Sequence, residues 1–117
     1  MDRHVYWHLE VNINPGKFET LKALMHEMVT RVQQHEPGTL QYAWSINKDR
    51  TECHLNERYA DSDAALAHMK NFQEHFSERF MACVTPTRFL VYGHVTDRLR
   101  SAWPPGAVQI FEPLGGF

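Results

Sequence analysis

The side chains best suited to chemistry in this 117-residue chain are a glutamate and two histidines set among aromatic residues. Apolar residues alternate along 53–59, and Glu57 falls on their side of that pattern, which predicts a carboxylate among apolar groups. His68 and His75 are seven positions apart and flank one stripe of phenylalanines. Burial disfavours the charged form of either group, so each could act as a base near neutral pH. We expect the catalytic residues to be Glu57 and His68.

Ordinary structural roles are the alternatives for these groups. Glu57 could instead form a salt bridge with Arg58, Lys22 or a helix terminus, and His68 could donate a hydrogen bond to a backbone carbonyl at the edge of the core. His75 lies nearer the end of its helix, where a structural role is favoured. The sequence contains no nucleophile elbow, phosphate-binding loop or dinucleotide fingerprint. An enzyme of this kind would depend on its substrate for much of the reactivity, and we expect no cofactor.

Aromatic side chains surround the expected position of the glutamate. Buried Trp and Tyr residues carry polar atoms that need partners, and a cluster of them often borders a ligand cavity. We expect a substrate-binding group made of Trp7, Tyr42, Trp44, Tyr59 and Phe72. The alternative is that all of these rings pack as ordinary core.

The hydrophobic pattern defines the elements that must position these residues. Period-two alternation over 4–13, 40–46, 53–59 and 89–95 predicts four strands. Two helices are predicted between them. The first follows Asn14-Pro15-Gly16 and ends at Pro37-Gly38, and the second begins at Asp61-Ser62-Asp63, with the stripe Ala65, Met69, Phe72, Phe76 and Phe80. This order, βαββαβ, predicts an α+β ferredoxin-like fold with an antiparallel sheet of order 4-1-3-2 and both helices on one face.

The remaining residues form a C-terminal extension. We divide the chain into a ferredoxin-like domain over 1–96 and an extension over 97–117, which combines a short helix or turn with a strand. Trp103-Pro104-Pro105-Gly106 predicts a turn, and 107–112 predicts a short apolar strand. Such a strand needs an edge to join, either that of its own sheet or that of a partner.

The sheet face turned away from the helices is polar but unusual in composition. It is rich in His, Tyr and Asn rather than Lys, Glu and Thr, which suits a partly buried interface better than a solvated face. We expect a homodimer in which two such faces meet, with contacts from Tyr6, His8, Glu10, Tyr92 and His94. A solvated face is the alternative.

The histidines of this face also raise the question of a metal. His8, His54 and His94 share one strand parity, but the sequence contains no HxH or HExxH motif that would make their nitrogens converge. We interpret them as a hydrogen-bonded polar layer and predict no metal site.

Composition excludes several classes of protein. There are 12 basic and 14 acidic residues, so no basic excess favours nucleic acid. No apolar run approaches the ~20 residues of a membrane span, and residues 1–4 do not resemble a secretion signal. Cys53 and Cys83 form no CxxC pair, which is typical of free thiols in a reducing compartment. We expect a cytoplasmic protein that binds neither nucleic acid nor membrane.

Two segments resemble the antibiotic-biosynthesis monooxygenase (ABM) domain. These are Glu36-Pro37-Gly38-Thr39-Leu40, with Tyr42 and Trp44 after it, and the run from Glu57 to Leu66 (ERYADSDAAL), with His68 after it. The similarity extends over about residues 4–96. It implies a dimeric α/β barrel, made of two ferredoxin-like protomers joined through their open sheet faces, with a pocket between sheet and helices in each protomer. Glu57, Tyr59 and His68 match recurring positions of the family pattern.

The resemblance also implies an activity. Characterised relatives oxidise polycyclic phenols or quinols with O₂, without metal or flavin, and others cleave haem; the haem-degrading residue set is not reproduced here. We therefore expect a cofactor-independent monooxygenase, in which His68 or Glu57 deprotonates a phenolic or quinol-type substrate. One alternative is a small-molecule-binding or stress-response protein that uses the same barrel without catalysis, and another is a structural dimer whose aromatic residues are all core.

Overall fold

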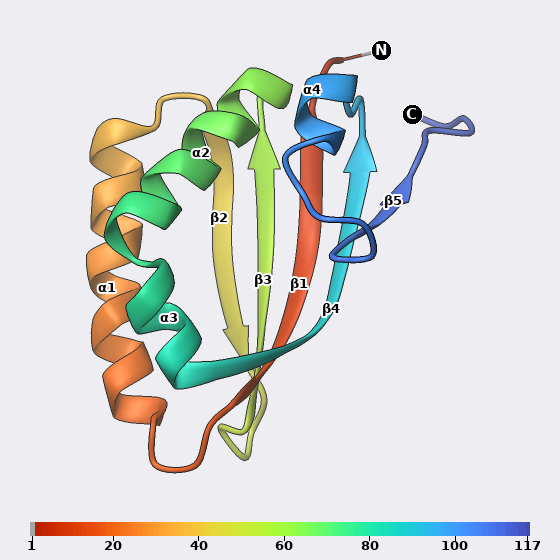
Figure 1. Ribbon diagram of the computed structural model, residues 1–117. Coiled ribbons are helices and arrows are strands. Elements are labelled where there is room, and N and C mark those ends of the chain that lie inside the picture. Colours follow the sequence, from red (N-terminus) through yellow and green to blue (C-terminus); the bar gives the residue numbers. More distant parts are fainter. Residues whose placement is uncertain (1) are drawn as a thin grey trace.

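The computed structural model describes residues 2–117 and contains four helices and five strands among them (Figure 1). In chain order they are β1 (Val5–Ile13), α1 (Phe18–His35), β2 (Thr39–Ile46), β3 (Glu52–Tyr59), α2 (Ser62–His75), α3 (Ser77–Cys83), β4 (Val84–Gly93), α4 (Asp97–Arg100) and β5 (Gln109–Phe111). The predicted α+β ferredoxin-like fold is confirmed.

All strands belong to one sheet of order β2-β3-β1-β4-β5. The first four follow the predicted order 4-1-3-2, and every pair among them is antiparallel. In the central pair Trp7 lies opposite Glu57 and Leu9 opposite Leu55. This register places the carboxylate of Glu57 beside an indole on the face that the helices cover.

The sheet has one covered face and one open face, as the alternation of β1 predicts. Val5, Trp7 and Val11 are buried under the helices, whereas Tyr6 on the opposite side is 38% exposed. Figure 1 shows α1, α2 and α3 packed along one side of the sheet, with no helix over the other side. The core therefore lies between the sheet and these helices, and any enclosed site has to form there.

The helices differ from the predicted ones in two details. The first begins at Phe18, because Asn14 to Lys17 form a turn in which the Lys17 N–H donates to the Asn14 carbonyl. The second is interrupted at Phe76, which has non-helical backbone angles and separates α2 from α3. No proline or glycine causes this break, and the rings of Phe76 and Phe80 are both buried beside it. Tertiary packing therefore overrides a continuous helical pattern.

The C-terminal extension packs against the same sheet. The side chain of Leu99 in α4 is fully buried, and β5 pairs in parallel with β4, where Val91 lies opposite Ile110. In this structure the last strand joins the edge of its own sheet (Figure 1). The loop between α4 and β5 thereby crosses the open end of the gap between sheet and helices. No helix in the described chain is both long enough and apolar enough to cross a membrane.

Candidate active site

Three charged side chains form a buried row of ionic contacts between the sheet and α2. His68 on α2 lies 2.7 Å from Glu36 through Nδ1 and 3.1 Å from Glu57 through Nε2. The side chains of all three are at most 8% exposed. Glu57 comes from β3, and Glu36 is the residue that ends α1. Three separate elements therefore contribute one side chain each.

The two neighbouring carboxylates favour the protonated form of the histidine. Each ring nitrogen lies within 3.1 Å of a carboxylate oxygen, and an ionised carboxylate only accepts hydrogen bonds, so this arrangement favours hydrogen on both nitrogens. Burial alone would lower the pKa of His68, but the hydrogen bonds and negative charges of Glu36 and Glu57 outweigh burial and raise the pKa to about 9. His68 is an imidazolium at neutral pH. It therefore holds a proton there rather than taking one.

Glu36 is held in place by neutral donors as well as by His68. Its carboxylate accepts hydrogen bonds from the Thr39 hydroxyl at 2.7 Å and from the Asn71 amide. Burial raises the pKa of the Glu36 carboxyl, but the bond from His68, with those from Asn71 and Thr39, outweighs burial and keeps the pKa below its ordinary value. Glu36 is thus a permanent anion behind the imidazolium.

A glycine allows α2 to approach this network. A Cβ added at Gly38 would lie 2.6 Å from the Cβ of Ala64, in the first turn of α2. That turn is capped by Asp61, whose side chain accepts from the Ala64 N–H at 2.8 Å. The close approach at Gly38 brings His68, one turn further along α2, within reach of Glu36.

Glu57 is bonded on one oxygen only. The Tyr59 hydroxyl donates to Oε1 at 2.5 Å, and His68 contacts the same oxygen. Burial, and then the charge of Glu57, raise the pKa of Tyr59 well above its ordinary value, so this phenol remains a donor. Among the described residues, Oε2 of Glu57 takes part in no hydrogen bond. This oxygen is available to a ligand.

A cavity of about 440 Å³ lies beside Glu57 and His68. The side chains that line it are largely aromatic or apolar. They come from the sheet, from α1, α2 and α3, and from the loop after α4. Its aromatic lining includes Trp7, Tyr42, Phe72, Phe89 and Trp103. The Tyr42 ring centroid is 5.3 Å from that of His68, and the Trp7 centroid is 6.3 Å from it. Rings thus lie beside the carboxylate and the imidazolium on the wall of the cavity.

The sequence profile of the family described as antibiotic biosynthesis monooxygenase matches residues 5–82, more than half of the chain. The chain belongs to this family. It is accordingly an enzyme of the ABM type, with a monooxygenase-type function. Among curated proteins no match to the sequence was found.

Solved structures agree with the family assignment. The crystal structure of MupZ from Pseudomonas fluorescens is 29% identical and superposes with a TM-score of 0.87, covering 100% of this chain and 90% of that one. SnoaB from Streptomyces nogalater, a cofactor-independent oxygenase, is 14% identical with a TM-score of 0.65 and covers 78% of this chain and 91% of its own. The similarity to SnoaB shows that the two proteins share the ABM fold.

The structure brings most of the residues expected from the sequence into one site. Trp7, Tyr42 and Phe72 line the cavity together with Glu57 and His68. Tyr59 is fully buried behind Glu57, where it orients the carboxylate. Trp44 lines a neighbouring cavity of about 270 Å³ near the start of α1, and contacts Tyr42 edge-on at 6.0 Å. His75 is exposed and lies apart from the site.

Sequence reasoning missed two residues of the site. In the sequence Glu36 appears only as part of the segment that resembles the ABM family. Its position after a helix does not indicate a hydrogen bond to His68, which is 32 positions away. Trp103 was assigned to a turn outside the domain, yet its ring lies 5.7 Å from Trp7 and 5.8 Å from Phe89. An aromatic residue in an exposed turn was the available signal, because such rings are usually packed against something.

Proposed function

We propose that this protein is a cofactor-independent monooxygenase that oxidises a phenolic or quinol-type aromatic molecule with O₂. The observation that carries the proposal is the free Oε2 of a buried carboxylate, Glu57, in a cavity lined by rings. A phenol of the right size places its ring among these aromatic side chains and its hydroxyl against that oxygen. The family and the oxygenase SnoaB, which shares the fold, support this class of reaction.

Glu57 is the base in this scheme, and His68 positions it. Two carboxylates and one imidazolium leave a buried surplus of one negative charge, which a proton transferred to Glu57 would neutralise. His68 cannot take the proton because both of its nitrogens already hold one. Its charge, 3.1 Å from Oε1, also stabilises the anion that forms on the substrate nearby.

The reaction balances without any further reductant. Glu57 removes the phenolic proton, and the phenolate passes one electron to O₂, which gives an aryloxyl radical and superoxide. These combine at a ring carbon to form a C–O bond, and the protonated Glu57 returns its proton to the terminal oxygen of the peroxide anion. The hydroperoxide then loses water, because its O–O bond breaks while the hydrogen of that ring carbon leaves as a proton. A phenol with a free para position thus becomes a quinone, with one oxygen atom in the product and the other in water. The apolar walls keep bulk water away from the radical pair.

We also propose that the protein acts as a homodimer through its open sheet face. On that face the Arg58 guanidinium lies 4.2 Å from the Tyr6 ring centroid, and Tyr6 stacks on Tyr92 at 5.4 Å. Tyr92 in turn stacks on Phe111 of β5 at 5.4 Å. Tyr6 is 38% and Phe111 41% exposed, so this stack offers apolar surface to a second copy. His8, Glu10 and His94 belong to the same proposed contact.

Oxygen consumption with a panel of phenols, naphthols and quinols tests the proposed activity. We expect O₂ uptake at a stoichiometry of one per substrate oxidised, and a fall of about 10²–10⁴-fold in kcat for Glu57→Gln. Glu74→Gln, on the exposed side of α2, is the matched control and should keep the parent rate. Calorimetric binding of these molecules without O₂ uptake would instead support the small-molecule-binding alternative and overturn the proposed reaction.

A further inference from the structure

A second cluster of side chains with potential ligand atoms lies on the open face of the sheet, opposite the aromatic cavity. One atom each from His8, Glu10 and His54 lies within 4.8 Å of the other two. His8 and Glu10 share one side of β1, and His54 lies directly across from Glu10 on β3. Two adjacent central strands therefore fix the backbone positions of all three.

The hydrogen bonds of His8 identify the nitrogen that it can offer. Its Nδ1 lies 2.8 Å from the Asn56 side-chain oxygen, an acceptor, so Nδ1 carries hydrogen. Its Nε2 then holds the lone pair in the neutral ring, yet this atom lies 2.9 Å from a carboxylate oxygen of Glu10. Two acceptors face one another here, and either a proton or a metal ion between them satisfies both.

The second histidine is oriented in the same manner. Nε2 of His54 lies 2.5 Å from a carboxylate oxygen of Glu52, which leaves Nδ1 as the nitrogen with the lone pair. A carboxylate or amide oxygen that fixes the far nitrogen of each histidine is the usual outer shell of a metal site in proteins. The rings of His8 and His54 meet edge-on with centroids 4.9 Å apart, so both are partly shielded from water.

We propose that His8, Glu10 and His54 bind a divalent transition-metal ion such as Zn²⁺ or Co²⁺, in place of the metal-free polar layer that the sequence predicts. Because His8 and Glu10 also belong to the proposed dimer contact, the ion would lie at that contact. Two imidazoles and one carboxylate are ligands that these ions prefer, and a water molecule would complete a tetrahedral set. Ligand atoms about 2.1 Å from a common ion lie about 3.4 Å apart. The three ligand atoms lie within 4.8 Å of one another, so they have to approach one another by at most about 1.4 Å to bind one ion.

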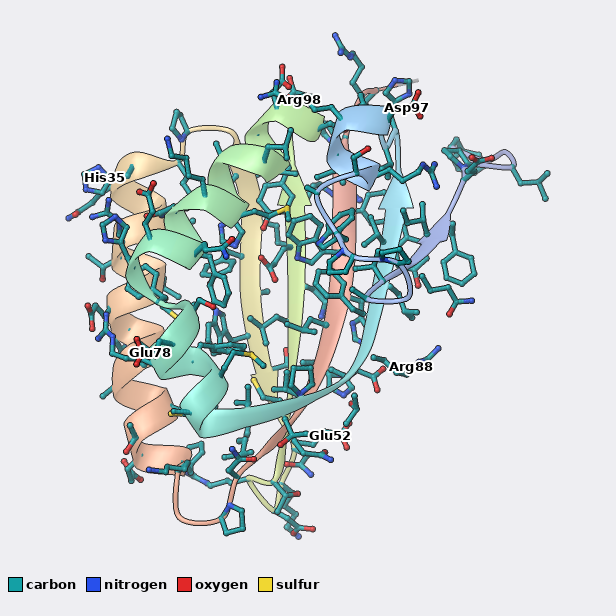
Figure 2. The ribbon with its side chains drawn as sticks, in the orientation of Figure 1. His35, Glu52, Glu78, Arg88, Asp97 and Arg98 are labelled. Atoms are coloured by element: carbon teal, nitrogen blue, oxygen red, sulfur yellow. The ribbon has the colours of Figure 1, made fainter. Side chains whose placement is uncertain are left out.

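Arg88 is the cation that competes with a metal at this position. Its guanidinium lies 3.7 Å from Glu10, but the Arg88 side chain is 58% exposed and can turn into solvent. Figure 2 labels Arg88 on β4 and Glu52 near the hairpin end of β3, both toward the same end of the sheet. Removing this positive charge should strengthen metal binding.

The experiment is a titration of the full-length, chelator-treated protein with Co²⁺ and Zn²⁺, followed by visible absorption and calorimetry. We expect one ion per chain and the visible bands of tetrahedral Co²⁺. His8→Ala and His54→Ala should each weaken binding at least tenfold, and Glu52→Gln about 10–100-fold. Arg88→Gln should tighten it several-fold.

His35→Ala is the matched control, because this histidine is exposed at the end of α1, which packs on the other face of the sheet, and its loss should change nothing. Figure 2 shows His35 on the far side of the molecule from Glu52 and Arg88. Circular dichroism confirms that each variant is folded. The proposal is overturned if neither ion binds saturably up to millimolar concentrations, or if His54→Ala binds as tightly as the parent. Phenol oxidation is not part of this test, so its outcome is independent of the proposed activity.

Discussion

The protonated state of His68 should make the free energy of unfolding depend on pH. A histidine with two buried carboxylate partners is stabilised in its charged form in the folded chain, whereas in the unfolded chain it titrates at its ordinary pKa of 6.5. Because folding raises the pKa, the stabilisation is fully present below pH 6.5 and is lost as the pH rises through about 9.

The magnitude follows from the two pKa values. A rise from 6.5 to about 9, at 1.36 kcal/mol per pKa unit, corresponds to about 3 kcal/mol. The side chain is only 8% exposed, so solvent screening removes little of this energy. Between pH 6.5 and 9 the free energy of unfolding should therefore fall by about 3 kcal/mol because of this one residue.

Urea unfolding of the parent and of His68→Gln at intervals from pH 6 to 10 measures this contribution. The other histidines titrate in both proteins, so the difference between the two curves isolates His68. We expect the variant to be about 3 kcal/mol less stable at pH 6.5 and the difference to vanish near pH 10. Parallel curves over the whole range would refute the assignment of an imidazolium held by Glu36 and Glu57.

Should His68→Gln fail to fold, the parent protein still provides the test. Proton or ¹³C NMR titration follows the His68 ring directly, and its midpoint should lie near 9. A midpoint at or below 6.5 would show that the ring is neutral at physiological pH, which would contradict the imidazolium and leave His68 able to accept a proton.

Three further substitutions probe how the site and the assembly are built. Gly38→Ala should destabilise the fold by about 1–3 kcal/mol, because the new Cβ would lie 2.6 Å from that of Ala64, and adding Ala64→Gly should restore most of the lost stability. Denaturant unfolding measures both effects, and the absence of either the loss or the rescue would contradict the close contact. Trp103→Ala should raise KM about tenfold and change kcat less, because the substrate loses about 1.4 kcal/mol of binding free energy from contact with this ring. An unchanged KM would show that the loop after α4 does not contribute to substrate binding. Tyr6→Glu should convert the dimer into monomers, as measured by sedimentation velocity, whereas Met81→Glu, at a similarly exposed residue of α3, should leave the dimer intact. A dimer that persists in Tyr6→Glu would count against the contact between open sheet faces.

The sequence predicted the scaffold because its signals are local. Alternation along β1 and β3, together with the helical stripe on α1, specified which face of the sheet is covered, and hence that Glu57 points into the core. Glu57 is 4% exposed, in agreement with that prediction. Short-range patterns suffice here because the side-chain period of a strand leaves only two faces to choose between.

The chemistry of the site was less predictable because it depends on contacts between distant residues. The sequence offered His68 and Glu57 as alternative bases, and only the position of Glu36, on the far side of the ring, separates their roles. The helix break at Phe76 and the inward turn of Trp103 likewise depend on tertiary packing, for which no local pattern exists.

If Glu57 initiates the proposed oxidation, O₂ supplies the new oxygen atom of the product. Oxidation of an accepted phenol under ¹⁸O₂ in ordinary water, analysed by mass spectrometry, tests it most directly. We expect one ¹⁸O atom in the quinone, the other in water, and almost no product from Glu57→Gln. Product oxygen that comes from water instead, with no O₂ consumed, would contradict it.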